Sequence, residues 1–152
     1  MKSLIEFTDE KYFKKIKSKN KFKAIEELAL VFKDSHVCSD TGALITALKE
    51  REEIMSTGVG FGLAIPHAKI KEVRDPAFAI GISSKGIDFD SIDGKPVNLL
   101  ILVAAGEKQH REYLRLLSNI MAILKEKKVR DKIINSKSIR DIYYIFENQK
   151  VS

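Results

Sequence analysis

The segment Val97-Asn98-Leu99-Leu100-Ile101-Leu102-Val103 decides the fold, because it is an almost uninterrupted apolar run of strand length. Such a run is typical of a strand that is buried on both faces, since a half-exposed strand would alternate apolar and polar residues. Upstream, Ala77-Phe78-Ala79-Ile80-Gly81-Ile82 predicts a second strand, and Ile92-Asp93-Gly94-Lys95-Pro96 between them has the residue types of a turn. We therefore expect deeply buried strands in the middle of the chain.

Helical periodicity is found on both sides of these strands. Before them, apolar residues in 22–32 recur at helical spacing, and a second helix is expected over about 39–50 with Ser39 as its N-cap. After them, a helix is expected over about 108–124, followed by two shorter ones, the last capped by Ser138. This order predicts an α/β three-layer sandwich, in which helices cover both faces of a small mixed β-sheet.

The composition fits a domain with its own core. The 152 residues are 44% hydrophobic, which is enough to bury a core without disulfides or metals. The single cysteine, Cys38, suits a reducing compartment. No apolar stretch approaches the ~20 residues of a membrane-spanning helix, and the first residues lack a signal-peptide pattern. We expect a single domain over 1–152, in the cytoplasm and not inserted into a membrane.

The net charge of +6 raises the question of a nucleic-acid partner. The lysines are spread along the chain, with groups at 11–23 and 125–128, and no aromatic residues alternate with them. Zinc-finger spacing and RNA-recognition motifs are absent from the sequence. Solvated lysine-rich helix faces are the commoner cause of such a charge, so no nucleic-acid partner is expected.

The glycine-rich segment Gly58-Val59-Gly60-Phe61-Gly62 leads into a short apolar run and then into Pro66 and His67. Proline lacks an N–H and fixes φ, so Pro66 is expected to end the strand and set the direction of His67. The glycines allow close backbone approach and leave amides free to face an anion. Their spacing is not that of a dinucleotide fold or a P-loop. From these residues alone, His67 is either functional or an ordinary core or surface histidine.

The stretch Gly60-Phe61-Gly62-Leu63-Ala64-Ile65-Pro66-His67-Ala68 resembles the active-site signature of enzyme IIA domains of the bacterial phosphotransferase system, of the mannitol, fructose and nitrogen-regulatory type. The resemblance extends in the right order over about 5–148 and includes 48–52, 56–58, 92–97 and 110–114. It implies that the phosphocarrier HPr donates a phosphoryl group to His67. The group then passes to an enzyme IIB domain of a sugar permease or serves as a regulatory mark. A neutral imidazole is a competent nucleophile for this chemistry, and no metal or cofactor is required.

The resemblance also implies helper residues, each of which has an ordinary structural alternative. Arg51 is expected to bind phosphoryl oxygens, or else to be a surface arginine paired with Glu52. His110, at a helix start, is expected to hydrogen-bond the phosphoryl group, or else to be solvated. The adjacent Glu52 and Glu53 could act as bases, but paired glutamates at a helix end are expected to be solvated.

Four further residues complete the expected phosphoryl-binding set: Thr57, Gly58, Gly60 and Phe61. Thr57 is expected to offer its hydroxyl or amide to the phosphoryl group, or else to cap the turn. Many relatives carry a small polar residue, often Asn, in place of Phe61. Next to the phosphoryl site, this ring would add apolar surface for docking HPr or would shield the phosphoramidate from water.

Several roles stay open at this stage. Within the family, the chain either feeds a sugar permease through enzyme IIB or acts on a regulatory target protein. A different class is a binding module in which phosphorylation only switches a partner interaction, without onward transfer. Another is a regulatory domain from a larger transcriptional regulator.

Overall fold

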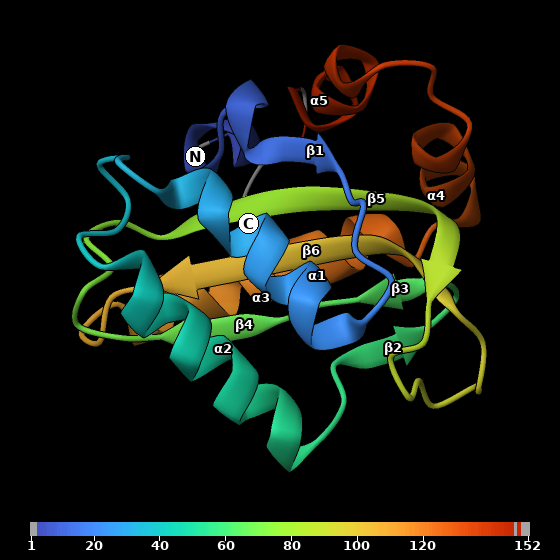
Figure 1. Cartoon of the computed structure of the whole chain (residues 1–152). Helices are drawn as coiled ribbons and strands as arrows, with labels where there is room; N and C mark the ends of the chain where they lie inside the picture. The colour runs from blue at the N-terminus through green and yellow to red at the C-terminus, as the bar shows by residue number, and fades with distance from the viewer. Residues whose placement is uncertain (1–2, 148, 150–152) are drawn as a thin grey trace.

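The computed structural model describes residues 3–147 and 149, and a mixed β-sheet runs through its centre (Figure 1). The strands are β1 (Phe13–Lys15), β2 (Gly58–Gly60), β3 (Leu63–Ala64), β4 (His67–Lys69), β5 (Ala77–Ile87) and β6 (Val97–Ala105). They are ordered β1-β5-β6-β3-β2 across the sheet, and β4 also pairs with β6. The central pair β5 and β6 is antiparallel, whereas β3 and β4 run parallel to β6 and β1 runs parallel to β5.

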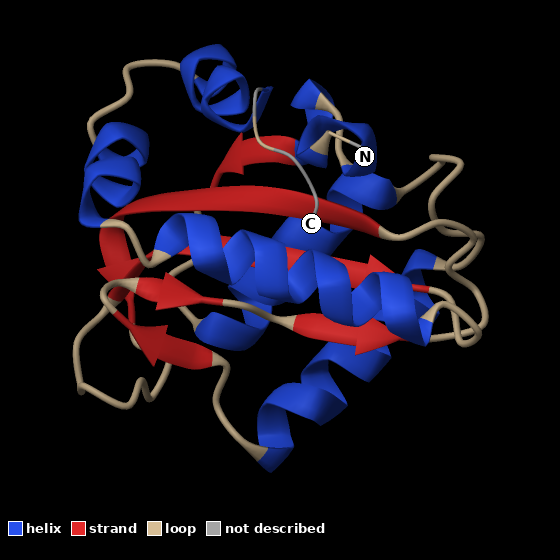
Figure 2. Ribbon diagram, turned by 180° about the vertical axis from the view of Figure 1, so that it is seen from behind, coloured by secondary structure: helices blue, strands red, loops and turns tan. Residues whose placement is uncertain are grey.

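Helices cover both faces of this sheet. They are α1 (Lys21–Ala29), α2 (Thr41–Ile54), α3 (His110–Leu124), α4 (Lys127–Ile134) and α5 (Ile139–Glu147), with short 3-10 helices η1 (Leu4–Phe7), η2 (Glu10–Tyr12) and η3 (Leu30–Phe32). Figures 1 and 2 show α1 and α2 on one face and α3 on the opposite face. This confirms the predicted α/β sandwich. None of the helices in the described part of the chain is long and apolar enough to cross a bilayer.

The core is centred on β6, as its apolar run predicts. The side chains from Leu99 to Ala105 are 0% exposed, and each fully buried Leu or Ile contributes roughly 1.5–3 kcal/mol. Both central strands extend beyond the predicted bounds, β6 to Ala105 and β5 to Ile87. The extension of β5 was not predicted because residues 83–86 are not apolar and do not continue the apolar run. A register irregularity between Ile82 and Ile87 accompanies them.

Of the two predicted N-caps, the one at Ser138 is correct and the one at Ser39 is wrong by one residue. Ser138 caps α5, because its Oγ accepts a hydrogen bond from the Asp141 N–H at 3.2 Å. The cap of α2 is Asp40 and not Ser39, since Asp40 Oδ1 accepts from the Ala43 N–H at 3.0 Å. The hydroxyl of Ser39 donates instead to the Glu72 carbonyl at 3.2 Å.

The segment that carries His67 is an interrupted strand beside β6. β3 pairs Leu63 with Leu99 and β4 pairs His67 with Val103, so the pairing is interrupted at Ile65 and Pro66, although the Pro66 carbonyl still accepts from the Val103 N–H at 3.0 Å. The prediction that Pro66 ends the strand is therefore only partly right, because His67 begins the next strand. Upstream, the expected glycine turn contains the strand β2, in which a Cβ on Gly58 would collide with the Ser91 side chain.

Candidate functional site

His67 lies half-buried as the first residue of β4, and the break before it decides its hydrogen bonding. Its Nδ1 is 2.7 Å from the Ile65 carbonyl oxygen. A carbonyl oxygen can only accept, so Nδ1 donates and the neutral ring keeps its lone pair on Nε2. Burial lowers the pKa of His67 below its usual value, against the raising effect of this hydrogen bond. The site therefore favours a neutral imidazole with Nε2 as its nucleophilic atom.

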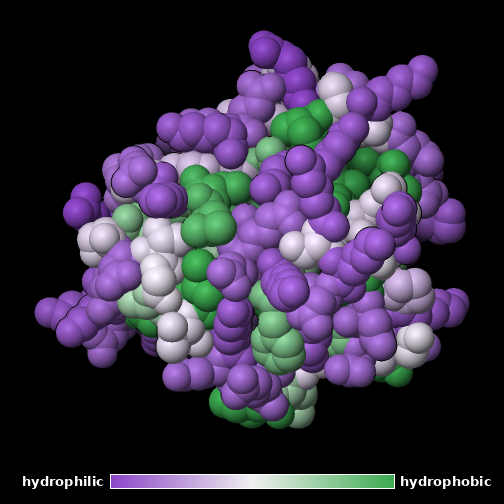
Figure 3. Space-filling view, in the orientation of Figure 1, coloured by the Kyte–Doolittle hydropathy of each residue, from purple (hydrophilic) through white to green (hydrophobic). Residues whose placement is uncertain are grey.

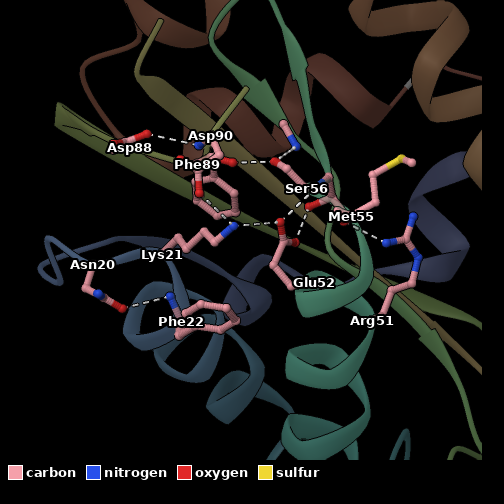
Figure 4. Close-up of polar contacts among 12 residues, drawn as sticks. Asn20, Lys21, Phe22, Arg51, Glu52, Met55, Ser56, Asp88, Phe89 and Asp90 are labelled. Carbon is pink, nitrogen blue, oxygen red and sulfur yellow. Dashed lines mark hydrogen bonds and ion pairs between the residues drawn. The ribbon is translucent and has the colours of Figure 1, made fainter. Parts of the chain in front are cut away.

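Two helices bring side chains to His67. Tyr113 of α3 is 8% exposed, and its ring centroid is 6.0 Å from that of His67. Arg51, in the last turn of α2, lies close enough for its charge to lower the pKa of His67, a smaller effect than that of burial. Figure 4 shows Arg51 and Glu52 pointing to different sides of the helix end, with Arg51 Nη1 donating to the Met55 carbonyl at 2.8 Å. Among the described residues, Arg51 makes no ion pair with Glu52.

Lys69 is a site residue that the sequence analysis did not single out. It lies two residues after His67 and therefore on the same face of β4. Its Nζ is 2.9 Å from Nδ1 of His110, the first residue of α3. The ammonium donates to Nδ1, which leaves the proton of a neutral His110 ring on Nε2 as a free donor. His110 and Tyr113 are one helical turn apart, so α3 lines His67 and Lys69 together.

The structure corrects the roles expected of Thr57 and Gly58. Thr57 is buried, its N–H donates to Glu52 Oε2 at 2.8 Å, and its hydroxyl donates to Glu52 Oε1 at 2.6 Å. The Gly58 N–H donates to Ser56 Oγ at 3.0 Å. These donors are therefore occupied and do not face a phosphoryl group. Glu52 is also corrected, because it is 2% exposed and not solvated, whereas Glu53 is exposed as expected.

Gly60 and Phe61 lie away from His67, contrary to the expectation. Gly60 is the last residue of β2, and Phe61 lies in the turn before β3. Leu63, after this turn, pairs with Leu99, which lies four residues before Val103, the partner of His67 on β6. Four strand residues span about 13 Å, so the turn belongs to another part of the sheet. Phe61 is 68% exposed, and the Arg130 guanidinium of α4 lies 4.7 Å from the centroid of its ring. Phe61 therefore neither shields His67 nor adds docking surface beside it.

The assembled site suits an anion that reacts with a nitrogen nucleophile. It combines the neutral His67 ring, the cations of Arg51 and Lys69, and the donor Nε2–H of His110. Two cations beside a neutral nucleophile favour a doubly charged group such as a phosphoryl group. In the described part of the chain, no group of three or more His, Cys, Asp or Glu residues is arranged to hold a metal.

The amino-acid sequence of this chain is similar to those of phosphotransferase-system components. The chain is 39% identical over 115 residues to the fructose-specific EIIA component of Haloferax volcanii, covering 76% of this chain and 75% of the relative. It is 37% identical over 123 residues to the fructose-specific EIIABC component of Bacillus subtilis. That match covers 81% of this chain but only 19% of the longer relative.

Solved structures share the fold. The nitrogen regulatory protein IIA-Ntr of Neisseria meningitidis superposes with a TM-score of 0.85 at 24% identity, covering 94% of this chain and 98% of that one. Enzyme IIA for mannitol from Escherichia coli, in a complex with phosphorylated enzyme IIB, superposes with a TM-score of 0.76 at 16% identity, covering 90% and 94%. The model of the family "Phosphoenolpyruvate-dependent sugar phosphotransferase system, EIIA 2" matches residues 6–149. The chain therefore belongs to the EIIA type 2 family of the phosphoenolpyruvate-dependent sugar phosphotransferase system.

Proposed function

We propose that this chain is a phosphocarrier that accepts a phosphoryl group from phospho-HPr on Nε2 of His67. The observation that carries the proposal is the 2.7 Å hydrogen bond from His67 Nδ1 to the Ile65 carbonyl, in a half-buried ring with a lowered pKa. This bond fixes the tautomer that leaves Nε2 free to attack. As Nε2 bonds to phosphorus, positive charge develops on the ring, and the Ile65 carbonyl stabilises it through Nδ1–H.

The transfer exchanges one phosphorus–nitrogen bond for another. Nε2 of His67 supplies the electron pair of the new bond, and the pair of the broken bond returns to the donor's ring nitrogen. In such a loose transition state, negative charge is spread over the three equatorial oxygens. Arg51, Lys69 and the Nε2–H of His110 are the groups that we assign to this charge. The same three groups serve the onward transfer, because they hold the same phosphoryl oxygens when the group leaves His67.

Apolar surface beside the site supports a protein as donor and acceptor. Three large apolar side chains adjoin Arg51 and Tyr113 and remain exposed: Ile54 (80%), Met55 (69%) and Leu114 (50%). Elsewhere, the face seen in Figure 3 is mostly hydrophilic, with hydrophobic residues in small separate areas. Exposed apolar residues around a reactive side chain are typical of surfaces that bind other proteins.

The acceptor that we propose is an enzyme IIB domain. The support is the relatives' fructose-specific names and the complex of the Escherichia coli mannitol enzyme IIA with phosphorylated enzyme IIB. The second candidate is a regulatory role without onward transfer, which the likeness to the nitrogen regulatory protein of Neisseria meningitidis supports. The two differ in whether a phosphorylated chain loses its phosphoryl group to IIB.

Intact-mass spectrometry tests the proposal at neutral to alkaline pH, after incubation with enzyme I, HPr and phosphoenolpyruvate. We expect one acid-labile phosphoryl adduct on the wild-type chain and none on a His67→Ala variant that remains folded. Adding a IIB domain then separates transport, in which the adduct is lost, from regulation, in which it is kept. An adduct on His67→Ala would refute the site. Absence of an adduct while HPr is phosphorylated would refute the carrier function.

A further inference from the structure

Glu52 is a buried acidic residue for which the transfer reaction has no direct use. It lies in the last turn of α2, its side chain is 0% exposed, and both of its oxygens accept hydrogen bonds from Thr57. Lys21, at the start of α1, places its Nζ 3.5 Å from Glu52 Oε2 and 3.4 Å from Asp90 Oδ2. A carboxylate is removed from water only where charge and hydrogen bonds replace the lost solvent, so this position is specific.

These contacts join three parts of the chain at one point. Figure 4 shows the ammonium of Lys21, from α1, between Glu52 of α2 and Asp90 of the loop after β5. The same loop is held at Phe89, whose carbonyl accepts from the Ser56 hydroxyl. Glu52 therefore holds Thr57 to the end of α2, at the point where the chain leaves the helix and enters β2.

Thr57 connects Glu52 to the phosphoacceptor through two further hydrogen bonds. The Ile65 N–H donates to the Thr57 carbonyl at 3.0 Å. The Ile65 carbonyl, in turn, accepts from His67 Nδ1 at 2.7 Å. Ile65 and Pro66 lie between the paired residues of β3 and β4, and the Pro66 carbonyl accepts from the Val103 N–H of β6 at 3.0 Å. The N–H of Ile65 itself bonds to Thr57 and not to β6, so Thr57 holds the residue whose carbonyl orients His67. The position of the carbonyl that orients His67 thus depends on Thr57, and that of Thr57 depends on Glu52.

We propose that Glu52 is a positioning residue for the phosphoacceptor. Its buried carboxylate fixes Thr57 and, through the Thr57 and Ile65 carbonyls, fixes the orientation and tautomer of the His67 ring. This inference rests on the proposed function for its catalytic consequence, but its structural part concerns the unphosphorylated protein. A displacement of about 1 Å at a reacting group can lower a rate by about 100-fold. A small shift of His67, transmitted through these hydrogen bonds, is therefore sufficient to slow phosphoryl transfer.

The test measures the ¹⁵N signals of the His67 ring in the unphosphorylated protein, together with the rate of phosphorylation by phospho-HPr. Glu52→Ala is expected to replace the single Nδ1–H tautomer by a mixture and to slow phosphorylation by about 10- to 100-fold. Glu52→Gln is expected to restore the tautomer, because its amide oxygen can accept from the Thr57 N–H and its amide group can donate to the Thr57 hydroxyl. Glu53→Ala, which changes the exposed neighbour on the same helix, is the matched control and should match the wild type.

A purely structural Glu52 predicts a different pattern. A folded Glu52→Ala protein with lowered stability but wild-type ring signals and rate would overturn the proposal. If Glu52→Ala does not fold, Thr57→Val takes its place, because it removes only the hydroxyl contact; a tautomer mixture then supports the proposal and wild-type signals overturn it. The ring signals stay informative even if the wild-type chain accepts no phosphoryl group, so failure of the proposed function can be distinguished from failure of this inference.

Discussion

Replacing Tyr113 by alanine tests how strongly burial controls the reactivity of His67. Tyr113 is 8% exposed and its ring centroid lies 6.0 Å from that of His67, so the two rings pack beside each other. Burial is the largest cause of the lowered pKa of His67. Removing the ring admits water, and the pKa of His67 should rise toward the usual value of about 6.5.

The same substitution has a cost in stability that follows from the burial of Tyr113. Truncating a buried aromatic side chain to alanine lowers the free energy of unfolding by about 3–5 kcal/mol. In a domain of this length, each kcal/mol corresponds to about 2–4 °C in Tm, so a decrease of about 6–20 °C is expected. Tyr113→Phe keeps the ring beside His67 and should change the pKa and Tm much less.

The assay is an NMR titration of the His67 ring in the wild type, Tyr113→Ala and Tyr113→Phe, with Tm measured on the same samples. The rate of phosphorylation at pH 6.5 should fall more in Tyr113→Ala than the rate at pH 8, because more of the ring is protonated at the lower pH. A folded Tyr113→Ala protein whose His67 pKa equals that of the wild type would refute the assignment of burial as the dominant cause.

Three further predictions concern the cations and the acid range. Arg51→Ala should slow phosphorylation by roughly tenfold or more, the effect of losing one charge-assisted hydrogen bond, and rapid-quench kinetics with an unchanged rate would remove Arg51 from the site. Lys69→Met should slow the same step to a similar extent and should also let the neutral His110 ring exchange tautomers, which ¹⁵N NMR would detect; a wild-type rate and a single tautomer would count against Lys69. The pKa of His67 is lower in the folded than in the unfolded chain, so the unfolded chain binds more protons between the two values. The contribution of His67 to stability should therefore be complete above about pH 6.5 and be lost as the pH falls through the folded pKa; urea midpoints that fall equally with pH in the wild type and in His67→Gln would contradict this.

Much of the fold is predictable because the apolar pattern of a single segment shows whether that segment is buried. Local sequence is sufficient to recognise the apolar run of β6 and the apolar stripes of α1 and α3. Each of these patterns depends on residues that are adjacent or one helical turn apart. The strands β1, β2 and β4 are three residues long and exist through pairing with distant partners. No local pattern encodes such partners, so these strands were not predicted.

The site shows the same limit. His67 is identified by its own segment, but nearness in sequence is a poor guide within extended chain. Phe61, six residues away, lies farther from His67 than the early residues of α3, because each strand residue advances the chain by about 3.3 Å. Lys69 could have been found from its alternation with His67 on one strand. Glu52 is buried because Lys21 and Thr57, which lie outside α2, contact its carboxylate. The pair of adjacent glutamates in the sequence gives no sign of these contacts.

The ring atom that carries the phosphoryl group tests the central claim most directly. The chain is phosphorylated with enzyme I, HPr and phosphoenolpyruvate after ¹⁵N labelling of its histidines, and ³¹P–¹⁵N coupling locates the phosphorus. Because His67 Nδ1 is occupied by the Ile65 carbonyl, we predict a single phosphoryl group on Nε2 of His67. Phosphorus on Nδ1 of His67, or on His36 or His110, would contradict the account.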